Sequence, residues 1–466
     1  MKKLFAIVLL LTFSVLIAPK FIGQYRHEAL TTYLKQLDAM PGYSAKLVKY
    51  QPGWFTSVGI ILIKADVSGV FSQNSQAEKH IIERILNQGL VLDISVQHGP
   101  VVISPDFNLA LNSFQIGLNQ QQKWVSEIQS KLQLDYLLIS KFQTSLAGNL
   151  ANQFYIPSFT LQNSDQSIVF GGVSIFTQMS NANTQYQTHG VINKSTAISP
   201  IVTFEAEPIQ INAEGQISDS LLFSYGDASF IFPKLSMTGK KQFELTNFVL
   251  STQVAKQNDN DLSIGYKISL DSFSSSESPI KLKNTEFAIT IDSLNESGLI
   301  QLYQLNQNAS KLPEHEHRQE IVRLLTELIQ HKPKINLHKL NFALDEVNYL
   351  TSNATAYFND KFSQAPKFNS QAALRSALII EFNTQFTENL VQQIITQNMA
   401  HTGEKNQIPA ADITALQAQQ VQSISQMLAQ YIEQKLLTKT EAGYQTQGLF
   451  KDNQLTLNNQ PLALGR

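Results

Sequence analysis

The stretch Leu262-Ser-Ile-Gly-Tyr-Lys-Ile-Ser-Leu270 decides the fold class of this chain. Large apolar residues occupy every second position along it, and small or polar residues stand between them. Successive side chains of a β-strand point to opposite faces of a sheet, so this period of two predicts a strand with one apolar face and one wet face. Such strands are typical of antiparallel sheets.

The same alternation recurs along much of the chain. Between residues 111 and 114 its phase shifts by one position, which predicts a β-bulge near Asn112 and Ser113. No Gly-rich strand-to-helix turn and no regular succession of strand and helix accompanies the pattern, so a doubly wound nucleotide-binding fold is not expected. The other segments with this period are 90–96, 107–111, 114–118, 287–291, 335–337 and 340–344.

Helical spacing of apolar residues appears in a few places between the strands. It predicts helices over 124–132, 321–328, 390–395 and about 412–437. Near the end of the chain, Asn458-Asn459 predicts a hairpin turn between two short strands. The fold class expected is therefore α+β, with extended, mainly antiparallel β-sheets and several packed helices.

Composition removes several classes of function. The chain has 466 residues, of which 15% are charged, and its formal net charge is -2. A chain without a basic field has little to attract nucleic acid, so no nucleic-acid partner is expected. The absence of cysteine excludes disulfides, thiolate metal sites and a cysteine nucleophile.

The N-terminus predicts export. Lys2 and Lys3 precede an apolar run over 4–18, the arrangement of a signal sequence. Leu16 and Pro19 disfavour cleavage after Ala18, so we expect an uncleaved, single-pass transmembrane anchor, although an ordinary cleaved signal stays open. The expected organisation is an anchor helix over 1–24, a juxtamembrane helix over 25–45, a β-rich exported region over 46–310 and a mixed strand and helix region over 311–466.

Two short motifs carry a family resemblance. Tyr50-Gln-Pro-Gly-Trp-Phe-Thr-Ser57 is similar to a Tyr-x-x-Gly-x-Phe-x-Ser element, and His98-Gly99-Pro100 follows downstream. Behind an N-terminal anchor, the two resemble the YdgA-like family of bacterial envelope proteins of unknown function. The resemblance implies an inner-membrane protein facing the periplasm, and it carries over no catalytic residue. The motif residues, expected to be structural, are Tyr50, Gly53, Phe55, Ser57, His98, Gly99 and Pro100.

His98 admits two interpretations. As a general base it would need a nucleophile or a metal and an orienting carboxylate within hydrogen-bond reach. As a structural residue it would pin the Gly99-Pro100 turn to neighbouring backbone through a ring nitrogen. We favour the structural interpretation, because no companion catalytic motif is present. A serine or aspartate within reach of His98 would favour the catalytic one.

Two other groups are interpreted as structural. Glu314-His315-Glu316-His317 could chelate a metal from an extended backbone, but it stands where a helix should begin, so we expect a solvated first turn and no metal site. Trp54 and Phe55 are open to two interpretations, a contact with the membrane interface or an anchor in the core. We expect the core, because Val58, Ile60 and Leu62 continue an apolar face.

The function expected from the sequence is that of a non-enzymatic, membrane-anchored periplasmic protein that binds a partner protein or a lipid through its sheet. No cofactor is expected, and self-association stays open. The alternative is an envelope hydrolase with a site assembled from distant residues around His98.

Overall fold

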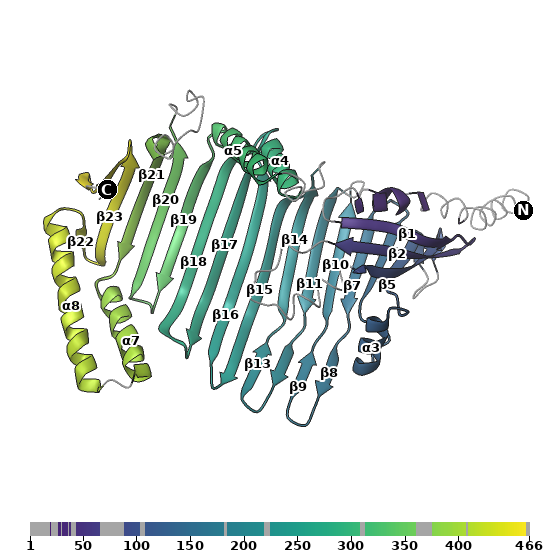
Figure 1. The fold of residues 1–466 in the computed structure, drawn as a ribbon, viewed down its shortest axis with the longest axis horizontal. Helices are drawn as coiled ribbons and strands as arrows, with labels where there is room; N and C mark the ends of the chain where they lie inside the picture. The colour runs from purple at the N-terminus through teal and green to yellow at the C-terminus, as the bar shows by residue number, and fades with distance from the viewer. Residues whose placement is uncertain are drawn as a thin grey trace, which may run out of the picture.

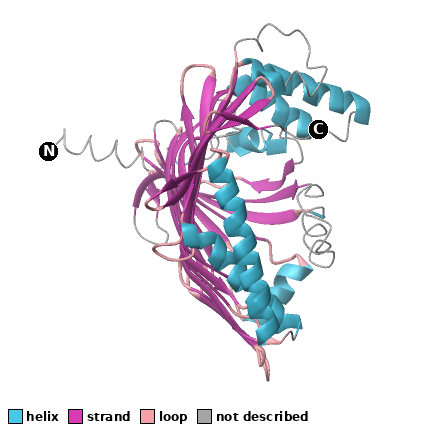
Figure 2. Ribbon diagram, turned by 90° about the vertical axis from the view of Figure 1, so that its left-hand side faces the viewer, coloured by secondary structure: helices cyan, strands magenta, loops and turns pink. Residues whose placement is uncertain are grey.

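The computed structural model describes residues 19, 27–28, 30–35, 37–38, 43–65, 88–102, 108–180, 184–218, 224–307, 313–359, 375–406 and 409–462. In these residues the strands join into one sheet by antiparallel pairings alone. The sheet curves as a single layer, and the helices lie on one side of it (Figures 1 and 2). The α+β class with a mostly antiparallel sheet, predicted from the alternation, is confirmed.

The N-terminal half of the sheet begins with a hairpin that runs across the direction of the later strands (Figure 1). From this hairpin, neighbouring strands follow in the order β1, β2, β3, β5, β6, β7, β10, β11 and β14. Their bounds are Tyr43–Gln51 (β1), Thr56–Ala65 (β2), Leu90–His98 (β3), Asn108–Leu118 (β5), Ile139–Ser145 (β6), Leu150–Ile156 (β7), Val173–Ser180 (β10), Gln185–Ile192 (β11) and Ile209–Ile217 (β14), with the short β4 at Val101–Val102.

The C-terminal half holds the longest strands and continues from β14 through β15 to β21, then β23, β24 and β25. Because β18 pairs with β19, the sheet continues across the boundary expected at residue 310. The bounds are Ser224–Gly239 (β15), Phe243–Lys256 (β16), Asp261–Ser275 (β17), Ser278–Asn295 (β18), Lys334–Ala343 (β19), Tyr349–Phe358 (β20), Leu378–Phe386 (β21), Thr438–Thr440 (β22), Gly443–Lys451 (β23), Gln454–Leu457 (β24) and Gln460–Leu462 (β25).

A branch of four shorter strands attaches to β15 beside β14, through the pairing of β13 with β15. These strands are Phe159–Gln162 (β8), Ser167–Phe170 (β9), Ser195–Ile198 (β12) and Val202–Ala206 (β13). The helices flank the sheet: α3 lies near its N-terminal end, α4 and α5 at one end of the long strands, and α7 and α8 at the C-terminal end (Figure 1). They span Lys123–Leu132 (α3), Glu296–Gln307 (α4), Glu314–Gln330 (α5), Glu388–Asn406 (α7) and Ala410–Glu433 (α8).

Most local predictions are confirmed. The stretch 262–270 lies within β17, and α3, α5, α7 and α8 contain the predicted helical stripes. Asn458 and Asn459 have φ of 46° and 63° between β24 and β25, as a hairpin turn with both central residues at positive φ requires. The bulge near Asn112 is also present, and its shift falls between Ala110 and Asn112 where β5 pairs with β6.

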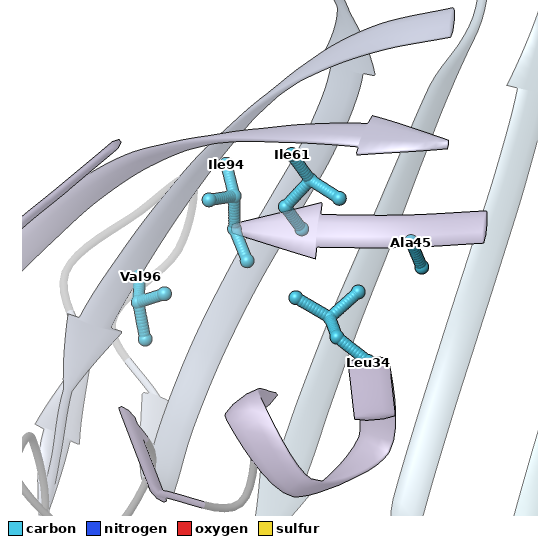
Figure 3. Packing of buried hydrophobic residues seen from close by; sticks show 5 residues of the cluster. All are labelled: Leu34, Ala45, Ile61, Ile94 and Val96. Atoms are coloured by element: carbon cyan, nitrogen blue, oxygen red, sulfur yellow. The ribbon is translucent and has the colours of Figure 1, made fainter. Parts of the chain in front are cut away.

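A buried hydrophobic cluster lies at the N-terminal end. Leu34 packs against Ala45, Ile61, Ile94 and Val96, so the helical residues between 27 and 38 cover the first strands (Figure 3). The region expected as a helix over 25–45 is thus helical at its described residues up to 38 and enters β1 at Tyr43.

The predicted anchor over 1–24 lies outside the described residues, apart from Pro19. Within the part of the chain that the structure describes, no helix combines the length and apolar character needed to cross a membrane.

Candidate functional site

The two family motifs meet in the fold. Ser57 is the second residue of β2 and His98 is the last residue of β3, and these strands are neighbours. The Ser57 Oγ lies 2.8 Å from Nε2 of His98. The same Oγ accepts a hydrogen bond from the backbone N–H of Gly53 at 3.2 Å. Residues from both motifs therefore form one hydrogen-bonded unit at the β1–β2 turn.

His98 lies in the interior. Its exposed fraction is 1%, as is that of Ser57. Its backbone N–H donates to the carbonyl of Phe55 at 2.8 Å, and the N–H of Gly99 donates to the carbonyl of Leu111 at 2.8 Å. The expectation that the His98 ring pins backbone is wrong, because the ring bonds a side-chain hydroxyl while main-chain groups secure the turn. His98 lies on the same face of β3 as Ile94 and Val96, because side chains two residues apart on a strand point the same way. The alternation in the sequence could therefore have indicated that His98 is buried.

The electrostatics of His98 are those of a neutral imidazole. Burial lowers its pKa below the usual 6.5. Its Nδ1 has no hydrogen-bond partner among the described residues, so no carboxylate orients the ring there. Asp93, the nearest preceding carboxylate in sequence, instead accepts from the Asn119 side chain at 2.6 Å.

A serine hydroxyl beside a neutral histidine is the minimal arrangement for nucleophilic catalysis. It meets the criterion that the sequence argument set for the hydrolase alternative. Two features oppose that chemistry: both side chains are closed to solvent, and the third, orienting group is missing from the described surroundings. We call the hydrogen-bonded unit of Gly53, Ser57 and His98 the latch.

Other motif residues surround this latch. The rings of Tyr50 and His27 stack with centroids 4.5 Å apart. A Cβ on Gly53 would lie 2.0 Å from the Thr56 carbonyl oxygen, so the tight turn excludes any larger residue there. On Gly99 a Cβ would lie 1.7 Å from the Ala110 carbonyl oxygen, which imposes the same restriction.

The core placement expected for Trp54 and Phe55 is wrong. Their exposed fractions are 47% and 51%, because they lie in the turn between β1 and β2, beyond the sheet. The face assignment of β2 is also reversed: Ile61 is 2% exposed while Val58 is 45% exposed. Both faces of β2 are apolar, so alternation alone could not distinguish them.

The Glu314–His317 segment forms the first turn of α5, as expected. His315 and His317 stand two residues apart on a helix, so their rings leave it in different directions. Among the described residues, no group of three or more metal-ligating side chains is close enough to hold an ion.

A second candidate surface is one face of the long central strands. Ile268 lies opposite Leu250 on β16 and Phe287 on β18, and residues directly opposite share a face. Three such rows of aligned side chains form what we call the apolar face. It comprises Ile211, Phe230, Leu250, Ile268, Phe287 and Leu340 in the first row, Ala213, Ala228, Thr252, Tyr266, Ile289 and Leu337 in the second, and Val254, Ile264, Ile291 and Ile335 in the third.

The apolar face lacks a full cover. Phe230, Tyr266, Ile268 and Ile335 remain between 37% and 45% exposed. On the opposite face of the same strands, the Glu286 carboxylate pairs with Lys267 at 3.0 Å and with Lys339 at 2.7 Å. The sheet therefore presents one polar face and one apolar face.

Comparison with known proteins identifies the family of this chain. A model for bacterial proteins of unknown function, DUF945, matches residues 1–465. The chain belongs to the DUF945 family. Neither the curated proteins nor the solved structures contain a match to it. The DUF945 match includes the central strands that carry the apolar face. The YdgA-like resemblance is consistent with this assignment.

Proposed function

We propose that this DUF945 protein is a non-enzymatic lipid-binding protein of the bacterial envelope, of the YdgA-like kind, that holds acyl chains on its apolar face. An uncleaved N-terminal anchor in the inner membrane would keep the bulk of the chain in the periplasm. The observation that carries the proposal is the half-exposed apolar face on β14 to β19.

The size of the apolar face supports a ligand. Six strands side by side extend roughly 24 Å, and three rows along a strand extend roughly 14 Å. An apolar patch of several hundred Å² is as large as the largest on typical soluble monomers, and such patches mark interaction sites. Apolar area covered by a ligand contributes about 25 cal/mol per Å².

The chemistry of the apolar face favours lipid over a protein partner. The described rows contain aliphatic and aromatic side chains with two neutral hydroxyl groups, those of Thr252 and Tyr266, and no charge. Protein interfaces place polar groups at their rims and use them for register and specificity. A surface without such groups suits acyl chains, which need no directional contact, and the basic and apolar N-terminal run would hold it beside a membrane.

Native mass spectrometry of the full chain, extracted into mild detergent, tests the proposal. We expect co-purifying phospholipid, and we expect Ile268→Asp to lose most of it, because a carboxylate on this face would contact acyl chains. Ser251→Asp is the matched control: Ser251 lies on the polar face opposite Lys267, where a carboxylate gains a charge partner. Equal lipid retention by a folded Ile268→Asp variant would contradict lipid binding at this face.

The hydrolase alternative rests on the Ser57–His98 contact alone. It requires the β1–β2 turn to open, since both side chains are buried. A fluorophosphonate probe that labelled Ser57, and that failed to label His98→Gln, would favour hydrolysis over lipid binding.

A further inference from the structure

A row of buried polar side chains crosses three strands beside the latch. His98 lies opposite Asn112, and Asn112 lies opposite Thr144. Their exposed fractions are 1%, 1% and 5%. Buried polar groups normally have hydrogen-bond partners, so each of these groups requires one.

The hydrogen bonds of Ser57 determine the tautomer of His98. The Gly53 N–H donates to Ser57 Oγ, and the only other partner of this oxygen among the described residues is His98 Nε2. If Nε2 donated instead, the buried Ser57 O–H would have no acceptor among the described residues. The O–H therefore donates to Nε2. Nε2 must then be unprotonated, and in a neutral ring the proton resides on Nδ1.

Three buried polar atoms of this row have no hydrogen-bond partner among the described residues. His98 Nδ1 and both side-chain atoms of Asn112, Nδ2 and Oδ1, are buried and form no hydrogen bond within the described residues. His98 and Asn112 lie directly opposite each other on the neighbouring strands β3 and β5. The Cβ atoms of such a pair lie about 5 Å apart. Their unpartnered groups thus lie within reach of one shared small molecule.

We propose that an internal water bridges His98 Nδ1 to the side-chain amide of Asn112. The Nδ1–H donates to the water oxygen, and the water donates onward to Asn112 Oδ1. Buried waters in proteins make two to four hydrogen bonds to polar groups that otherwise lack them, and these two groups supply such partners. The ring stays neutral at physiological pH because burial lowers the pKa of His98.

A crystal structure of the full chain tests the proposal directly. We expect an ordered water about 2.7–3.2 Å from His98 Nδ1 and from an Asn112 side-chain atom. ¹⁵N NMR of histidine-labelled full chain should show the His98 ring protonated at Nδ1. A direct bond from Nδ1 to Asn112 Oδ1, or a ring protonated at Nε2, would overturn the proposal, as would an ordered structure without the water.

A matched pair of variants adds a second readout. In Asn112→Leu the bridging water should be lost while Ser57 and His98 keep their hydrogen bond. Asn119→Leu removes a different buried asparagine, one that bonds Asp93, and should leave the water in place. Water retained in Asn112→Leu would assign it to other partners and contradict the bridge. The wild-type measurements decide the question even where a variant does not fold.

Discussion

Ser57 and His98, 41 residues apart in sequence, share a buried hydrogen bond of 2.8 Å. The bond joins the start of β2 to the end of β3, and the Gly53 N–H adds the β1–β2 turn to the same oxygen. What reads in the sequence as two separate motifs is therefore one structural unit, which secures the corner where the first hairpin joins the rest of the sheet.

Ser57→Ala should destabilise the chain. The substitution leaves His98 Nε2 and the Gly53 N–H without their partner. His98 is buried, and a buried group left unsatisfied costs about 1–3 kcal/mol, whereas Gly53 is an exposed residue and adds less. Urea denaturation of the full chain followed by circular dichroism measures the change. Ser126→Ala is the control, because it removes an exposed hydrogen bond to the Lys123 carbonyl and should change stability by less than about 0.5 kcal/mol. Equal effects of the two substitutions would contradict the latch.

His98 should make the stability depend on pH. Because burial lowers its folded-state pKa below 6.5, the unfolded chain binds more protons between the two pKa values. The free energy of unfolding therefore falls as the pH drops below about 6.5 and does not respond to this group above it. Comparing urea midpoints at about pH 7.5 and pH 5.5, we expect a larger fall for the wild type than for His98→Gln. The same fall in both would assign the dependence to other histidines.

Gly99→Ala should prevent normal folding. The new Cβ would lie 1.7 Å from the Ala110 carbonyl oxygen and 2.7 Å from that of Leu111, and both belong to backbone that cannot move independently. Gly117→Ala, also on the β3–β5 side of the sheet, places its Cβ 3.6 Å from the nearest atom and is the control. Yield and thermal melting of the full chains should show a large loss for Gly99→Ala and little change for Gly117→Ala. A normally melting Gly99→Ala chain would show that this turn can relax.

The local pattern of the sequence predicted much of the fold, because strands and helices have different apolar periods. The alternation at 262–270 identified β17, and the Asn458–Asn459 pair identified the last hairpin turn. The alternation at 90–96 also identified the buried side of β3, since Asp93 and Ser95 mark the opposite face.

The Ser57–His98 site was harder to predict from the sequence, because it depends on which strands pair and in what register. Nothing local to Ser57 indicates that it lies opposite Val96, two residues along β3 from His98. Alternation also marks an apolar face without saying what covers it. The exposure of Tyr266 and Ile268 therefore could not be read from their pattern, and the expectation of buried Trp54 and Phe55 failed because both lie in a turn and not in the strand that follows.

Asp345 should stabilise the turn between β19 and β20. Its carboxylate accepts hydrogen bonds from the Asn348 side chain, from the backbone N–H groups of Val347 and Asn348, and from the Gln393 side chain. These bonds, with that of the Asn348 side chain the largest contributor, lower the pKa of Asp345 to about 2. The stabilisation is present above the unfolded pKa of 3.8 and is lost as the pH falls towards 2. Asp345→Asn should cost about 1 kcal/mol at neutral pH, after allowance for solvent screening, and nothing below about pH 2. A cost independent of pH, measured by urea denaturation, would point to lost packing instead of lost charge.

The apolar face should contact acyl chains when lipid is present. Tyr266→Trp places a fluorophore on this face at a position that is 45% exposed, in a background in which Trp54 and Trp124 are changed to Phe. In lipid nanodiscs that contain phospholipids brominated on the acyl chains, we expect its emission to shift to the blue and to be quenched several-fold.

Lys267→Trp in the same background is the matched control, because the neighbouring residue of a strand points to the opposite, polar face. Its emission should stay at the wavelength of an exposed tryptophan, since bromines in acyl chains would not reach it. Equal quenching of both tryptophans would mean that the sheet lies against the membrane without preference for a face. Quenching of neither would mean that the apolar face is covered by protein, through a partner or a second copy of the chain.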